Sequence, residues 1–175
     1  MPGYRAKTAK RRLATLLGWS WIIFALVVPA GADVVNFKEL LPFVDIKIPG
    51  WIMEGKPSGN TLKQGDVMVS EVRVSFKASE QTLEIVIMDF LGKPLPFLTG
   101  QQLEMEGTEE TVRITEVQGF KALETFRPHE KQGELNISVA DRFWVKLDGE
   151  GIDNLEVLKK IAQQMDLKRL ATLAK

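Results

Sequence analysis

Apolar and polar residues alternate along much of the chain with a period of two, which is typical of half-buried β-strands. In the stretch from Val72 to Phe76 every second residue is apolar, and residues 83–88 are apolar on both faces. The second pattern predicts a central strand that is covered on both sides. Val67 and Val69 are one residue out of phase with the positions that follow, which predicts a β-bulge near Ser70.

The same alternation predicts further strands over 111–117 and 120–123, and a hairpin formed by 135–139 and 143–147. The two-residue connection Ala140-Asp141 separates the strands of that hairpin. Gly and Pro are frequent in 51–65 and in 91–107, so both segments are predicted to be connections. For 51–65 the pattern leaves a loop or a loose hairpin open.

Helical spacing occurs at the two ends of the segment that follows residue 32, and the connection 91–107 leaves a helical turn around Phe97 to Met105 open. Apolar residues at helix-like intervals predict a short helix over 34–44. Asp153, followed three residues later by Glu156, is typical of a helix N-cap with its reciprocal glutamate. Asp166 is a candidate cap for a last short helix.

These elements predict an α+β fold for residues 33–175. We expect one antiparallel sheet of about five to seven strands, packed against an N-terminal and a C-terminal helix. A sheet closed on itself is the alternative, and the doubly apolar strand 83–88 favours an open, covered sheet over it. A segment of this length fits one domain.

The first 32 residues have the order of parts of a secretory signal peptide. A basic head precedes an apolar run from Leu13 to Val28, and Ala30 and Ala32 then stand in the small-x-small relation that signal peptidase accepts. We therefore expect export by the general secretory route, cleavage after Ala32, and a periplasmic or secreted product. The alternative is a retained anchor in the inner membrane formed by 13–28, which is short for a spanning helix.

Charge and cysteine content narrow the class of partner. The chain has 23 basic and 23 acidic residues, and five of the basic ones precede residue 33, so residues 33–175 carry a formal charge near −5. This balance excludes nucleic acid as an expected partner, and it disfavours anionic membrane surfaces other than through the leader. Without cysteine the chain has neither a disulfide nor a thiol nucleophile.

The sequence assigns no catalytic, cofactor-binding or metal-binding residue. The only histidine, His129, is predicted to be exposed in a polar connection, and a zinc site needs several His or Cys ligands. Asp148, Glu150 and Asp153 could collect a calcium ion, but their spacing favours turn and cap roles. We expect a protein that is not an enzyme. Enzymatic activity would require carboxylates that converge in a cleft with perturbed proton affinity.

Aromatic and apolar residues outside the predicted core are the candidate binding residues. Trp144 alternates with Phe143 and Val145, so it points away from the face that those two residues bury. Trp51 follows Pro49-Gly50 and either anchors a partner or covers the core. The connection 91–100 is unusually apolar and is a candidate lid or docking surface. The candidate partner-binding residues are therefore Trp51, Trp144, Leu95, Phe97 and Leu98.

The C-terminal half resembles the closing strand-strand-helix unit of exported domains with the PsbP/Mog1-like fold. The resemblance rests on Gly119-Phe120-Lys121-Ala122, on Leu135 to Val139, on Arg142-Phe143-Trp144-Val145 and on the apolar positions Leu155, Leu158 and Ile161-Ala162. It implies a non-enzymatic accessory or binding domain. We expect an exported protein that recognises a protein partner in the cell envelope. The alternatives are a carrier of an apolar ligand, such as a lipid or acyl chain, and a signal-anchored subunit of a membrane complex.

Overall fold

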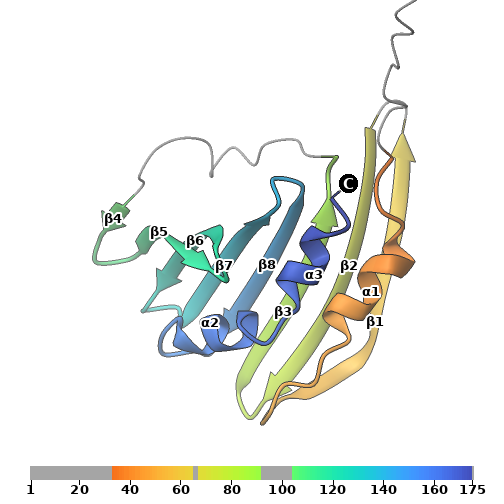
Figure 1. The fold of residues 1–175 in the computed structure, drawn as a ribbon. Coiled ribbons are helices and arrows are strands. Elements are labelled where there is room, and N and C mark those ends of the chain that lie inside the picture. The colour runs from red at the N-terminus through yellow and green to blue at the C-terminus, as the bar shows by residue number, and fades with distance from the viewer. Residues whose placement is uncertain (1–32, 65–66, 92–103, 175) are drawn as a thin grey trace, which may run out of the picture. The chain divides into compact units, whose positions relative to one another are not determined.

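The computed structural model describes residues 33–64, 67–91 and 104–174 (Figure 1). The predicted leader, residues 1–32, and Leu95, Phe97 and Leu98 lie outside these residues. Within them, no helix combines the length and the apolar character needed to cross a membrane.

Eight antiparallel strands form one sheet, in the order β1-β2-β3-β8-β7-β6-β5-β4. The predicted α+β fold with five to seven strands is therefore wrong, because the described chain is a β-rich fold with three short helices. The strands are β1 (Ile52–Gln64), β2 (Val67–Ala78), β3 (Gln81–Asp89), β4 (Glu104–Glu106), β5 (Thr111–Val117), β6 (Phe120–Arg127), β7 (Gln132–Val139) and β8 (Phe143–Glu150).

The pattern missed β4, which lies in the predicted connection 91–107 where a helical turn is the alternative, and it missed β1, which occupies the predicted connection 51–65. β1 is an edge strand, and most of its residues are exposed on both faces, so it shows no apolar alternation. Its register with β2 shifts between Glu54 and Ser58, where Pro57 lies. An edge strand with a bulge tolerates a proline because the missing N–H leaves no ladder bond unmade.

The predicted bulge near Ser70 is also wrong, because β2 pairs with β3 without interruption from Ser70 to Ala78. Val69 instead shares a face with Glu71 and Arg73, and Val72 and the alternate residues after it point to the other face. The change of phase in the sequence therefore marks apolar residues on both faces of a regular strand.

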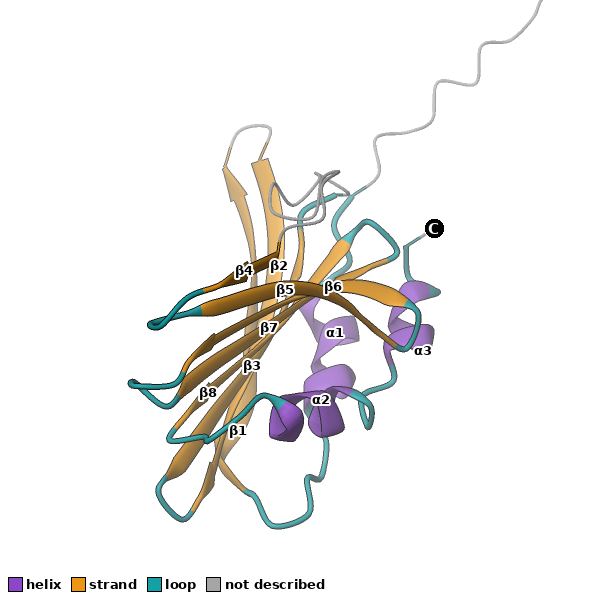
Figure 2. Ribbon diagram, turned by 90° about the vertical axis from the view of Figure 1, so that its left-hand side faces the viewer, coloured by secondary structure: helices purple, strands orange, loops and turns teal. Residues whose placement is uncertain are grey.

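The helices of the described residues lie on one face of the sheet, as Figure 2 shows. They are α1 (Phe37–Val44), α2 (Glu156–Ala162) and α3 (Leu167–Ala171). The core lies between them and the inward side chains of the central strands, in which Ile85, Ile137 and Val145 are fully buried. β3 is a central strand, as predicted, but the predicted cover on both sides is only partly confirmed. On the other face Val86 is buried, whereas Glu84 and Met88 are partly exposed.

Two glycines allow α2 to approach the sheet closely. Gly133 of β7 and Gly149 of β8 are paired across the ladder on the helix-covered face. A Cβ atom on Gly133 would lie 2.6 Å from Leu155 Cδ2, and one on Gly149 would lie 3.0 Å from Leu158 Cδ2. The absence of these two side chains leaves the space that the apolar residues of α2 fill.

The predicted caps agree with the structure at one helix and not at the other. Asp166 caps α3, because its Oδ1 accepts a hydrogen bond of 3.1 Å from the backbone N–H of Arg169. Asp153 does not cap α2, which begins later, and it forms an exposed ion pair with Lys131 instead. The first turn of α2 is capped by Asn154, whose Oδ1 accepts from Glu156 N.

Candidate functional site

The face of the sheet opposite the three helices, here called the open face, carries ion pairs at its centre. Lys146 Nζ lies 2.8 Å from Asp148 Oδ2 and 3.5 Å from Glu134 Oε2. Partial burial lowers the pKa of Lys146, but hydrogen bonds and charge from these two carboxylates outweigh that effect and raise it above its ordinary value. This part of the open face is polar and satisfied by its own charges.

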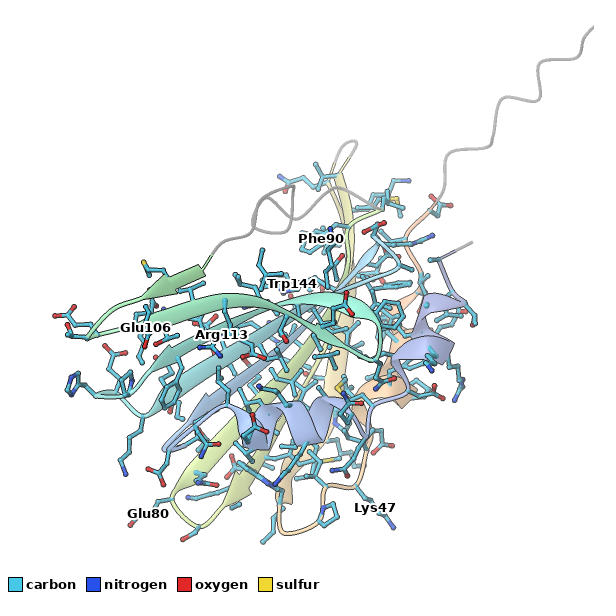
Figure 3. The ribbon with its side chains drawn as sticks, turned by 60° about the vertical axis from the view of Figure 1, so that its left-hand side comes forward. Lys47, Glu80, Phe90, Glu106, Arg113 and Trp144 are labelled. Atoms are coloured by element: carbon cyan, nitrogen blue, oxygen red, sulfur yellow. The ribbon has the colours of Figure 1, made fainter. Side chains whose placement is uncertain are left out.

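A different surface lies at the end of the open face where β3 leaves the sheet. The rings of Phe90 and Trp144 are stacked with centroids 6.2 Å apart, and both residues are labelled in Figure 3. Met88 is the cross-strand neighbour of Trp144. The indole N–H of Trp144 donates a 3.0 Å hydrogen bond to Asn136 Oδ1, which fixes the ring. We call Met88, Phe90 and Trp144 the aromatic patch, and all three are partly exposed.

The backbone beneath the aromatic patch is held by a buried ion pair. Asp89 is fully buried, and its carboxylate accepts hydrogen bonds of 2.8 to 3.1 Å from the guanidinium of Arg142. The same carboxylate accepts from the backbone N–H groups of Val35 and Leu91. Arg142 also donates to the backbone carbonyl of Asp33. Asp89 directly precedes Phe90 in the chain, and Arg142 lies two residues before Trp144. The ion pair therefore fixes both strand ends that carry the patch.

The structure separates the candidate residues that the sequence grouped together. Trp144 lies in the aromatic patch, and β3 brings Phe90, at the start of the apolar connection 91–100, beside it. Trp51 precedes β1 at the Lys77 end of β2, which is the opposite end of the sheet, and packs against the core. The sequence analysis missed Met88 and Phe90, although both continue the alternation of Val86 on the open face.

The clefts in the described residues bear on the predicted carrier of an apolar ligand. One cleft of about 260 Å³ lies beside α2, and one of about 290 Å³ lies beside the turns at Gly119 and Ala140. Neither has a Val or Ile in its lining, and charged or polar residues make up much of both walls. These clefts do not have the apolar lining that an acyl chain requires.

The other acidic candidates have partners of their own. Asp148 pairs with Lys146, Asp153 pairs with Lys131, and His129 is exposed in the turn between β6 and β7. Residues 33–64, 67–91 and 104–174 contain no group of three His, Asp or Glu side chains that could hold a metal ion.

Comparison of the chain with protein-family models, with curated proteins and with solved structures gave no match. The resemblance to PsbP/Mog1-like domains therefore stays a prediction, and the functional argument depends on the chain's own geometry.

Proposed function

We propose that this chain is an exported, non-catalytic binding protein that recognises a protein partner in the cell envelope through the aromatic patch. The observation that carries the proposal is the stacked pair of Phe90 and Trp144, which lies on the face that the helices of the described chain leave uncovered. Tryptophan and methionine are enriched at the centres of protein interfaces, where they supply a large contact area.

Two further features support the same proposal. The buried pair of Asp89 and Arg142 holds the patch in place before a partner arrives, which lowers the entropy lost on binding. The predicted leader supports export to the cell envelope. The negative formal charge of residues 33–175 favours a protein over nucleic acid as the partner.

Site-specific photo-crosslinking in the native host tests the proposed surface. A photoreactive residue at position 90 should form a crosslink to one recurring protein, which mass spectrometry identifies. The same residue at position 52 is the control, because Ile52 lies at the other end of the open face and is 76% exposed. Trp144→Ser combined with the reactive position 90 should reduce the crosslink about tenfold, as expected for loss of a central tryptophan.

Equal crosslinking from positions 90 and 52, or a crosslink that Trp144→Ser leaves unchanged, would contradict the proposed surface. Thermal unfolding of the Trp144→Ser protein is measured alongside, so that loss of folding is distinguished from loss of contact.

The proposed export has its own measurement, which is the mass of the protein purified from each cell fraction. A periplasmic species that begins at Asp33 supports cleavage after Ala32. A membrane-bound species with the intact leader supports the retained anchor formed by 13–28. A species with the intact leader in the cytosol would refute export.

A further inference from the structure

The cleft beside α2 lies on the helix-covered face, away from the aromatic patch. Its floor is formed by inward side chains of β5 and β6, and its wall is formed by α2 and the two residues before it. The volume is about 260 Å³, below the range of pockets that hold drug-sized molecules. The lining consists of Thr111, Arg113, Glu124, Phe126, Asn154, Leu155, Glu156 and Lys159.

Glu124 is a buried carboxylate in this cleft. Its side chain is only 4% exposed, and Lys159 Nζ lies 3.2 Å from its Oε1. Lys159 holds Oε1 as an ion-pair partner, and the described chain gives this oxygen no hydrogen bond of good geometry. Buried carboxylate oxygens are normally hydrogen-bonded, and an oxygen that is not has unused capacity to accept.

The ammonium group of Lys159 contacts two carboxylates, those of Glu124 and Glu156. Its contact with Glu156 Oε1 measures 2.9 Å, and this hydrogen bond is the main reason that the pKa of Lys159 is raised. The same hydrogen bond lowers the pKa of Glu156. A carboxylate with a lowered pKa is a poor general base at neutral pH, so the charges of the cleft are better suited to recognition than to proton transfer.

Arg113 is the cation of the cleft for which the described side chains form no ion pair. It is exposed and is labelled in Figure 3, and its register partner on β6 is Glu124. The side chains described here offer its guanidinium neither a carboxylate within 4.0 Å nor a hydrogen bond. Cross-strand neighbours have Cβ atoms about 5 Å apart, so Arg113 lies beside Glu124 on β6. Its register partner on β4 is Glu104.

We propose that this cleft binds an α-carboxylate with an adjacent N–H donor and an apolar side chain. The carboxylate pairs with Arg113, the donor meets Glu124 Oε1, and the side chain packs against Phe126 and Leu155. The charges of Arg113, Lys159, Glu124 and Glu156 sum to zero, so recognition of the carboxylate depends on its local contact with Arg113 and not on the net charge of the cleft. Both a free amino acid and the C-terminal residue of a polypeptide carry this chemistry.

Calorimetric titration of the purified chain with three probes tests the proposal. We expect binding of L-leucine or of N-acetyl-L-leucine, and no binding of L-leucinamide, which lacks the carboxylate. If N-acetyl-L-leucine binds with the same affinity as L-leucine, the site is assigned to a polypeptide C-terminus. Binding of L-leucine alone assigns it to a free amino acid. No binding of any probe in the millimolar range, or equal binding of L-leucinamide, would overturn the proposal.

Substitutions test the two polar contacts separately. Arg113→Gln and Glu124→Gln should each weaken binding about tenfold or more, because hydrogen bonds to charged groups are worth about 1.5–3 kcal/mol. Arg73→Gln is the matched control, since Arg73 lies on the open face and should leave the affinity unchanged. An affinity that Arg113→Gln does not alter would overturn the site even if a probe binds. Because this cleft and the aromatic patch lie on opposite faces, the photo-crosslink at position 90 is unaffected by either outcome.

Discussion

The buried ion pair between Asp89 and Arg142 gives the largest predicted effect on stability. The side chain of Asp89 is 0% exposed and that of Arg142 is 9% exposed. Arg142→Met removes the charged partner and leaves the carboxylate with two backbone donors, from Val35 and Leu91. Removal of one partner of a buried pair costs about 3–5 kcal/mol, and the remaining donors place the expected loss near the lower end, at about 3 kcal/mol.

Urea unfolding measures this loss. With a slope of about 2 kcal/mol per molar urea, the midpoint should fall by about 1.5 M. Arg73→Met is the control, because Arg73 pairs with Glu71 and Glu84 while its side chain is 51% exposed. Exposed pairs contribute about 0–1 kcal/mol, so the control should shift the midpoint little.

A double variant tests the reason for the effect as well as its size. Asp89→Asn combined with Arg142→Met removes the uncompensated charge. It keeps an acceptor for only one of the two backbone N–H groups, because Val35 donates to Oδ2 and Leu91 donates to Oδ1. Because the buried charge is gone, the double variant should still be more stable than Arg142→Met alone. A double variant that is equally or less stable, or a loss below about 1 kcal/mol for Arg142→Met, would refute the argument from the buried charge.

Three further predictions concern the helices and the open face. Gly133→Ala should lower the free energy of unfolding by about 1–3 kcal/mol, because the added Cβ would lie 2.6 Å from Leu155 Cδ2. Gly149→Ala should cost less, because its Cβ would lie 3.0 Å from Leu158 Cδ2. Urea midpoints in the reverse order would contradict this prediction. Asp166→Ala should cost about 1 kcal/mol in the same assay, whereas Asp153→Ala should stay within about 0.5 kcal/mol, since only Asp166 caps a helix. Because the folded-state pKa of Lys146 is raised, the stability lost in Lys146→Met should be constant from neutral pH to about pH 10.5 and should vanish as the pH rises through the folded-state pKa. A difference that grows with alkaline pH would show that charge is not the cause.

The sequence predicted those strands whose two faces differ in environment. β7 and β8 alternate cleanly because one face packs under the helices and the other carries ion pairs, and their hairpin is found as expected. β1 has no such contrast, since both of its faces are largely exposed and only its backbone bonds to β2 define it. Pattern analysis detects burial, and an exposed edge strand has little burial to detect.

The two carboxylates that matter most were visible in the sequence as exceptions to the pattern. Asp89 follows Leu83, Ile85 and Ile87 on the inward face of β3, and Glu124 lies between Ala122 and Phe126 on the inward face of β6. An acidic residue at an inward position must find a cation. The sequence could not say which cation, because Arg142 is 53 residues from Asp89, and Lys159 reaches Glu124 from a helix beyond two further strands.

The difference between these two buried carboxylates is the number of donors that reach them. Asp89 receives two backbone N–H groups and the guanidinium of Arg142, so its oxygens are saturated and its role is to hold the strand ends together. Glu124 receives one lysine that it shares with Glu156, and one of its oxygens has no hydrogen bond within the described chain. A saturated pair has no capacity for a ligand, whereas an unsaturated one beside an open cleft gains a hydrogen bond when a donor enters. The donor count therefore assigns a structural role to the first carboxylate and a binding role to the second, although both arise from the same exception in the sequence.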